Sequence, residues 1–303
     1  MQGAPTTILA VRIDMISNRT TSANVRPAAV AGSWYPNDPH RLTNYLTNLL
    51  TTVPTVTTPG PIRALISPHA GYTYSGITAG AVYKNLRGLT FKRVIILGPA
   101  HYGRFNGLSI GPYSAFATPL GLIPVDQPAV TELYRSPIVN ADPKVHIQEH
   151  CIEMQLPFLQ ITLTPGWQLL PILVGYLQHD DAKMIAELLQ PLADTSTLIV
   201  VSSDFTHYGP RFGYLPFAAD SKIAERLKKL DDGLIQALIA NNIKQFEFYS
   251  ESTKITACGI NPMAILLHLL QSNTQGTLHK YTTSGELTKE YTNSVSYASI
   301  SFH

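Results

Sequence analysis

The chain has 303 residues, of which 45% are hydrophobic and only 14% charged, with 22 Lys and Arg against 20 Asp and Glu. This length suits one large α/β domain or two small ones, and so apolar a composition excludes intrinsic disorder. The near balance of charge, without a long basic cluster, excludes the electrostatic footprint of a nucleic-acid or membrane-surface binder. So little charge also favours a surface partly covered by a partner subunit, as in a homo-oligomer.

The lack of a recognisable targeting signal and the low cysteine content favour a reduced, cytoplasmic location. The first residues lack a basic segment, and their apolar run is broken at Arg12. No later run approaches the roughly 18 apolar residues of a membrane span. Cys151 and Cys258 are the only cysteines, fewer than a secreted chain held by disulfides normally carries.

The predicted elements begin after a loose arm at residues 1–25, which is rich in Thr, Ser and Asn and has no period. From residue 26 to 303, short β-branched runs alternate with amphipathic stretches, the pattern of βαβ units and a largely parallel sheet. We predict strands at 62–67, 93–97, 169–174 and 197–202, and helices at 39–51, 76–86, 150–161, 181–189, 216–229 and 261–270. The runs HKYTTSG and NSVSYASISF predict closing antiparallel strands. The expectation is a single three-layer α/β domain with a central, largely parallel mixed sheet flanked by helices.

Polar residues follow three of these strands directly. His69 follows the first strand, His101 the second, and Asp204 and His207 a later one. Ligands of an open parallel sheet bind beyond the carboxyl ends of its strands. A lone His in such a place is usually a hydrogen-bonded loop residue, and Asp204 is also suited to capping a helix. Four such residues at one edge make a functional site as probable as loop packing.

Cys258 precedes the helix predicted at 261–270, where a helix N-terminus lowers a thiol pKa and favours the thiolate. The alternative is a small buried hydrophobic residue, and the residues alone do not decide between the two. No GxGxxG or GxxxxGK[ST] motif is present, so nucleotide binding has no support.

The stretch EHCIEMQ at 149–155 opens another predicted helix. Its apolar face leaves His150, Glu153 and Gln155 on flanking faces, and Glu149 and Glu153 would meet as like charges at i, i+4. These acidic residues either complement the helix dipole or contact the site.

Eight blocks of this sequence resemble the Memo family, called AmmeMemoRadiSam system protein B in prokaryotes. The resemblance runs from about Arg26 to the end of the chain. The blocks are AGSWYP at 31–36, SPHAGYTYSG at 67–76, ILGPAHY at 96–102, EHCIEMQLPFL at 149–159, PILVG at 171–175, VVSSDFTHYG at 200–209, ACG at 257–259 and SVSYASISF at 294–302.

That family in turn looks like the class III extradiol dioxygenases, which hold non-haem Fe(II) with two histidines and a carboxylate. The resemblance implies metal ligands at His69, His101 and Cys258, with Asp204 and His207 lining the same cleft. A cysteine stands where the carboxylate would complete the triad, so ring cleavage does not transfer by analogy. A further departure is Cys151, where EHS is the commoner spelling in the family.

The resemblance therefore implies a redox protein that binds Fe(II) or copper and uses O2 on a phenolic small molecule, with Asp204, His207 and His150 as candidate catalytic residues. The alternative is a non-catalytic adaptor that binds a peptide in the same cleft. Five aromatic residues would line that cleft, although ordinary packing in the core and at the rim explains them as well: Trp34, Tyr72, Tyr74, Tyr102 and Tyr208. A zinc hydrolase with His207 or Asp204 as base comes last, because zinc suits the donor set but no HExxH spacing is present.

Overall fold

The computed structural model describes residues 24–178, 180–218 and 220–303. The expected arm at 1–25 lies almost wholly outside these residues, and the first strand, β1, is Val25–Arg26. In the described part of the chain, we find no helix with the length and apolar character needed to cross a bilayer.

A nine-stranded mixed sheet forms the centre of the molecule, in the order β10-β12-β2-β9-β3-β8-β4-β7, with β11 also paired to β12. Its strands are β2 (Ala64–Ser67), β3 (Arg93–Pro99), β4 (Leu108–Ser109), β7 (Val139–Asn140), β8 (Gln168–Val174), β9 (Thr197–Ser202), β10 (His207–Tyr208), β11 (Gly276–Thr283) and β12 (Ser294–Phe302). The central strands β2, β9, β3 and β8 are parallel, whereas β12 and β4 flank them antiparallel. This confirms the predicted mixed, largely parallel sheet and its closing antiparallel strands.

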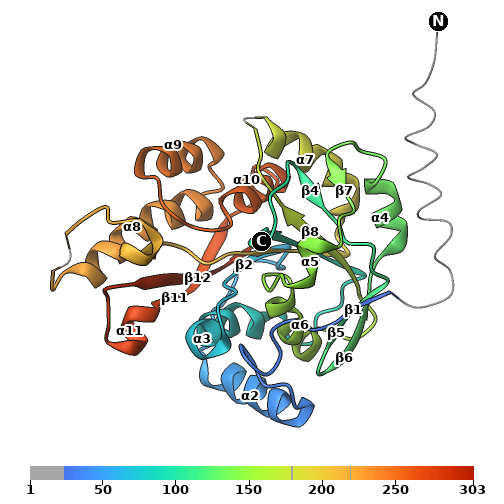
Figure 1. The fold of residues 1–303 in the computed structure, drawn as a ribbon, viewed down its shortest axis with the longest axis horizontal. Helices are drawn as coiled ribbons and strands as arrows, with labels where there is room; N and C mark the ends of the chain where they lie inside the picture. The colour runs from blue at the N-terminus through green and yellow to red at the C-terminus, as the bar shows by residue number, and fades with distance from the viewer. Residues whose placement is uncertain (1–23, 179, 219) are drawn as a thin grey trace, which may run out of the picture.

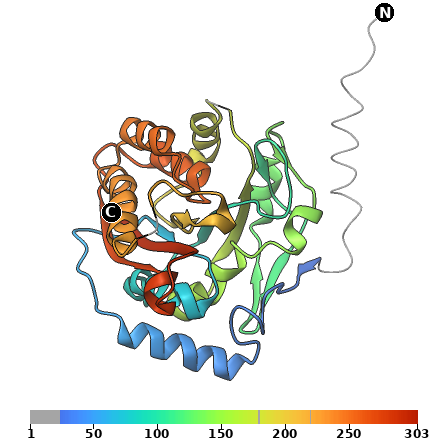
Figure 2. The same cartoon turned by 60° about the vertical axis from the view of Figure 1, so that its left-hand side comes forward.

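Helices cover both faces of this sheet, which gives three layers (Figures 1 and 2). On one face, α3 packs on β2, β11 and β12, and α2 and α6 lie beside it. On the other face, α10 packs on β9 and β3, and α7 and α9 lie beside it. Helix α8 covers β11 and β12. The helices are α2 (Pro39–Thr52), α3 (Tyr72–Tyr83), α6 (Leu156–Thr162), α7 (Asp181–Leu189), α8 (Ile223–Ile239), α9 (Ile243–Thr253) and α10 (Ile260–Leu269).

A small second sheet lies beside the main one, in the order β1-β5-β6. It consists of β1, β5 (Ala115–Thr118) and β6 (Gly121–Pro124), and β6 contacts β8. The short helices α4 (Gln127–Leu133), α5 (Lys144–Ile147) and α11 (Ser284–Thr288) complete the α-helices of the described residues. The small sheet matters for the site because it holds Arg26 beneath the loop that carries Glu149.

Local sequence signals explain the elements that were predicted closely. The central strands are buried along nearly their whole length, as expected when helices cover both faces of a parallel sheet. In α2, Leu42, Leu46 and Leu50 recur at i, i+4 and are buried. Asp38 caps this helix by accepting a 2.8 Å hydrogen bond from the backbone N–H of Arg41.

Three predicted helices begin at other residues than expected. Helix α3 begins at Tyr72 rather than at 76. The sequence pattern did not locate this start, because the helix is buried on nearly every side and shows no amphipathic period. The helix expected at 216–229 begins at Ile223 and continues to Ile239.

The helix expected at 150–161 is a 3₁₀ turn at Glu153–Gln155 followed by α6. The Glu149 carboxylate accepts the backbone N–H groups of His150 and Cys151, and this closes a turn in place of the first helical residues. Glu149 and Glu153 consequently make separate contacts, Glu149 with His101 and Glu153 with Arg26, instead of repelling one another at i, i+4.

Candidate metal centre

Three neighbouring parallel strands deliver the predicted residues to one edge of the sheet. His69 follows β2, His101 follows β3 and Asp204 follows β9. The backbone N–H of His69 donates to Oδ1 of Asp204 at 2.8 Å. The carboxyl ends of these strands therefore meet as the sequence predicts.

Three histidines surround the centre of this edge. One ring nitrogen from each of His69, His101 and His150 lies within 4.8 Å of the others. The ring centroids of His101 and His150 are 4.5 Å apart, and that of His69 is 5.2 Å and 5.3 Å from them. His150 was expected as a catalytic residue only, because a regular helix would have placed it on a flanking face. The turn formed by Glu149 brings it among the possible donors.

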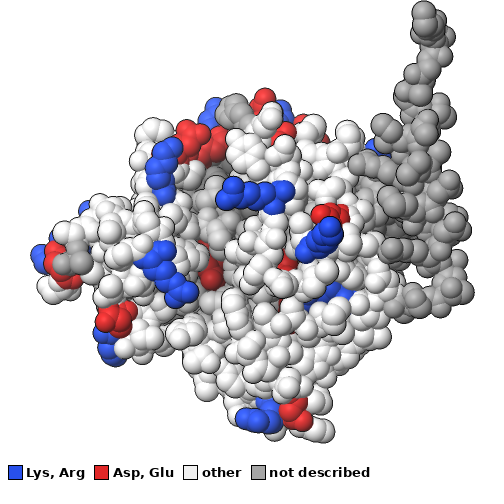
Figure 3. All heavy atoms as spheres, in the orientation of Figure 1, with Lys and Arg blue, Asp and Glu red and all other residues white. Residues whose placement is uncertain are grey.

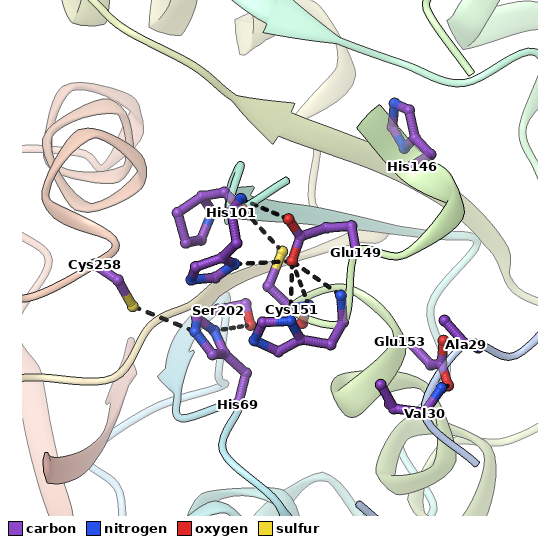
Figure 4. A network of polar contacts seen from close by, with 12 residues as sticks. Ala29, Val30, His69, His101, His146, Glu149, Cys151, Glu153, Ser202 and Cys258 are labelled. Atoms are coloured by element: carbon purple, nitrogen blue, oxygen red, sulfur yellow. Dashed lines mark hydrogen bonds and ion pairs between the residues drawn. The ribbon is translucent and has the colours of Figure 1, made fainter. Parts of the chain in front are cut away.

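Glu149 orients His101 (Figure 4). Its Oε1 lies 2.9 Å from Nδ1 of His101, and its carboxylate also accepts the backbone N–H groups of His101, His150 and Cys151. Burial alone would raise the pKa of Glu149, but the hydrogen bonds and charge of His101 outweigh it and lower the pKa to about 2. An ionised carboxylate only accepts, so Nδ1 of His101 carries the proton and Nε2 keeps a lone pair for a cation.

Cys258 approaches the cluster from the start of α10. Its Sγ lies 3.3 Å from Nε2 of His69, and the two side chains point toward one another in Figure 4. An ion bound tetrahedrally at about 2.3 Å from sulfur and about 2.0 Å from nitrogen would hold the two atoms roughly 3.5 Å apart. Among the described residues, Cys258 belongs to no group of three donors within 4.8 Å. His69 therefore lies close to both other expected ligands, to Cys258 through Nε2 and to His101 within the three-histidine group.

Of the two alternatives that the sequence leaves open for Cys258, the metal-free protein favours a neutral thiol over a thiolate. Burial, and then the charge of Asp204, raises the pKa of this thiol despite its place before α10. Burial exceeds the helix dipole because the thiolate would lose its hydration. A ligating cation reverses this balance, since a coordinating thiol is deprotonated.

Asp204 and His207 lie just beyond β9, and the Asp204 carboxylate accepts the backbone N–H of His69. Asp204 is 5% exposed, and burial raises the pKa of its carboxyl. Nδ1 of His207 lies 3.0 Å from the carbonyl of Phe205 and 3.1 Å from that of Thr256. Because carbonyls only accept, Nδ1 of His207 carries the proton and Nε2 is a free acceptor.

His150 shows that the cluster fits a cation. Its Nδ1 is buried without a hydrogen-bond partner, 3.4 Å from Oε1 of Glu149. A buried polar atom without a partner is costly, so a ligand at this point would stabilise the arrangement. Burial, and then His69 and His101, lower the pKa of His150 to about 3, so the ring is in its neutral, ligating form near neutral pH.

A second donor group consists of His101, Glu149 and Cys151. The oxygens of Glu149 already accept four hydrogen bonds, and Sγ of the buried Cys151 donates to the carbonyl of Pro99 at 3.2 Å. This group is therefore saturated and holds the turn in shape.

The five aromatic residues named above pack largely as core and rim residues and do not line one common groove. Tyr72 and Tyr208 are buried in the core, whereas Tyr74 and Tyr102 are 44% and 50% exposed. Trp34 packs on His150 with ring centroids 4.4 Å apart, and Tyr102 lies 6.0 Å from the same ring. Only Trp34 and Tyr102 of the five thus contact the cluster through His150.

On the face in Figure 3, basic and acidic side chains are interspersed among uncharged residues.

The fold and the cluster define an α/β protein with a candidate histidine and cysteine metal centre at the carboxyl edge of its parallel strands. Residues 26–301 match the family model described as Memo-like protein, and the chain belongs to the Memo family.

Relatives span nearly the whole chain. It is 34% identical over 281 residues to a MEMO1 family protein of Aquifex aeolicus, covering 92% of this chain and 99% of that protein. It is 36% identical over 290 residues to Protein memo-1 homolog of Caenorhabditis elegans, covering 91% and 82%. Among solved structures, an uncharacterized protein of Escherichia coli K12 aligns with a TM-score of 0.47 at 15% identity, covering 78% of this chain and 98% of that one.

Proposed function

We propose that this protein is a redox metalloprotein that binds Fe(II) or copper through His69, His101 and Cys258. The observation that carries the proposal is the 3.3 Å contact between Sγ of Cys258 and Nε2 of His69, beside two further imidazoles. Imidazole and thiolate donors suit iron, copper and zinc, and the soft sulfur favours Cu(I) over Mg²⁺ or Ca²⁺.

A bound Fe(II) or copper ion would supply electron transfer and open positions for O2 and a phenolic substrate. The residues around it would handle protons. His207 offers Nε2 as an acceptor, because its Nδ1 donates to backbone carbonyls. Asp204 is buried and its Oδ1 accepts the backbone N–H of His69, so its carboxyl lies beside a proposed metal ligand, where it would exchange a proton with a substrate. The unpartnered Nδ1 of His150 is a third place where a substrate proton or the ion itself would be held.

A peptide-binding adaptor that keeps the cleft without catalysis is the second candidate. The exposed ring of Tyr102, which lies 6.0 Å from the ring of His150, favours it, because an exposed ring beside the cluster offers apolar contact area to a partner. In that case the ion would organise the cleft and undergo no redox change.

The discriminating experiment loads the protein anaerobically with Fe(II), Cu(I) or Zn(II) and then measures O2 uptake with a panel of phenols. The redox function predicts uptake with Fe(II) or Cu(I), and none with Zn(II), which has no redox chemistry. Cys258→Ser, loaded in the same way, is the matched control for the site. Tight binding of all three metals without uptake would favour the adaptor.

A further inference from the structure

Ser202, at the end of β9, has a complete set of hydrogen bonds. Its Oγ donates to the carbonyl of Cys151 at 2.7 Å and accepts from Nε2 of Gln155 at 2.8 Å. Its third neighbour is Nδ1 of His69, at 2.9 Å. A hydroxyl has one hydrogen and two lone pairs, and the carbonyl must receive the hydrogen because it only accepts. The contact with His69 is therefore a hydrogen bond donated by Nδ1–H.

The amide of Gln155 is fixed in the orientation that this assignment needs. Its Nε2 also donates to the carbonyl of Pro68 at 3.0 Å, and its Oε1 accepts from the hydroxyl of Tyr83 at 2.8 Å. A flipped amide would place its oxygen against the Pro68 carbonyl, where no hydrogen lies between the two acceptors. Gln155 and Ser202 are both fully buried, so water does not compete for these contacts.

We propose that Ser202 and Gln155 are positioning residues that hold His69 with its proton on Nδ1, so that the lone pair of Nε2 faces Cys258. Neither residue reaches the cation position, and both act through His69. The purpose of this arrangement rests on the proposed metal function, because a ring nitrogen ligates only through its lone pair.

The same short segment serves the other histidine ligand. Glu149 holds His101 with its proton on Nδ1, while the Cys151 carbonyl and the Gln155 amide set the hydrogen-bond directions of Ser202. Through these contacts, residues 149–155 set the donor nitrogen of both His69 and His101, and the same segment contributes the third imidazole, His150. Losing a partner of this kind typically lowers metal affinity about 10- to 100-fold.

The proposal is tested by long-range proton–nitrogen NMR on metal-free protein labelled with ¹⁵N histidine. In the wild type we expect His69 protonated on Nδ1. In Ser202→Ala we expect the proton to move to Nε2, since Nδ1 then lacks its acceptor. The matched control is Ser109→Ala: Ser109 is equally buried and lies 3.1 Å from Nε2 of His146, which is outside the three-histidine donor group. This control should leave His69 unchanged.

Cu(I) affinity, measured by competition with a chelator, is the second readout. Ser202→Ala should bind Cu(I) about 10- to 100-fold more weakly than wild type, and Ser109→Ala like wild type. Gln155→Met, which removes the donor to Ser202, should shift both readouts in the same direction and serves if Ser202→Ala does not fold. Nε2–H on His69 in the wild type, or an unchanged tautomer in the folded variants, would overturn the proposal. Nδ1–H in a protein that binds neither Cu(I) nor Fe(II) would support the tautomer assignment and refute the proposed function.

Discussion

Sγ of Cys258 and Nε2 of His69 lie 3.3 Å apart although 189 positions separate them in the chain. The contact joins the start of α10 to the end of β2, and it places a soft donor beside an imidazole.

Cys258→Ser should weaken Cu(I) binding strongly, because a hydroxyl stays protonated near neutral pH and is a harder ligand. The stability of the metal-free protein should change little, since the two side chains are nearly isosteric. Chelator competition and urea unfolding measure the two quantities. Cys151→Ser is the matched control, because Cys151 is buried and its thiol donates to Pro99. Equal Cu(I) affinity in wild type and Cys258→Ser would remove Cys258 from the site.

Glu149→Gln should reduce Cu(I) or Fe(II) affinity about 10- to 100-fold, because His101 loses the anionic acceptor that holds its proton on Nδ1. The amide that replaces the carboxylate also has an NH₂ group, which cannot accept the backbone N–H groups of His150 and Cys151, so the protein should lose some stability as well. Isothermal titration of the folded variant gives the affinity. Glu132→Gln is the control, since Glu132 is 57% exposed in its pair with Arg135. Glu149 has no orienting role if both variants bind metal like the wild type.

Arg26→Met should destabilise the protein by about 3–5 kcal/mol, because it leaves the Glu153 carboxylate buried without its cation. Arg26 is 1% exposed, and its guanidinium also donates to the carbonyls of Glu149 and His146. Urea unfolding of the metal-free protein measures the loss. Arg135→Met, which breaks an exposed pair, should stay within about 0.5 kcal/mol of wild type. Similar losses in the two variants would mean that the buried pair has no special weight.

The metal-free protein should lose stability as the pH falls from about 6.5 toward 4. Burial, and then the charge of Arg26, lower the pKa of His146 from 6.5 to about 4. In that window the unfolded chain binds a proton that the folded protein does not, so stability rises with pH there and is complete above 6.5. His146 alone accounts for up to about 3 kcal/mol.

Urea unfolding between pH 4 and 7.5 tests this dependence on His146. His146→Gln should flatten the slope, whatever its effect at neutral pH, and the exposed His40→Gln should not. An unchanged slope in His146→Gln would assign the acid sensitivity to other groups.

The sequence predicted the strand ends well because each central strand is a short apolar run followed at once by polar residues. It did not reveal how residues 149–155 fold, since their apolar spacing fits a helix and the competing hydrogen bonds of Glu149 are visible only in three dimensions. For the same reason His150 appeared on a flanking face. The sequence also left the state of the Cys258 thiol open, because its position before a helix is readable from sequence whereas the surroundings of the sulfur beside Asp204 are not.

The central claim, that His69, His101 and Cys258 hold a metal ion, is tested most directly by a crystal structure of Cu(I)-loaded protein with anomalous data at the copper edge. We expect one strong peak about 2 to 2.3 Å from Nε2 of His69, Nε2 of His101 and Sγ of Cys258. A peak bound only elsewhere, such as at Glu149 and Cys151, or a fully loaded crystal without a peak in this cleft, would contradict the claim.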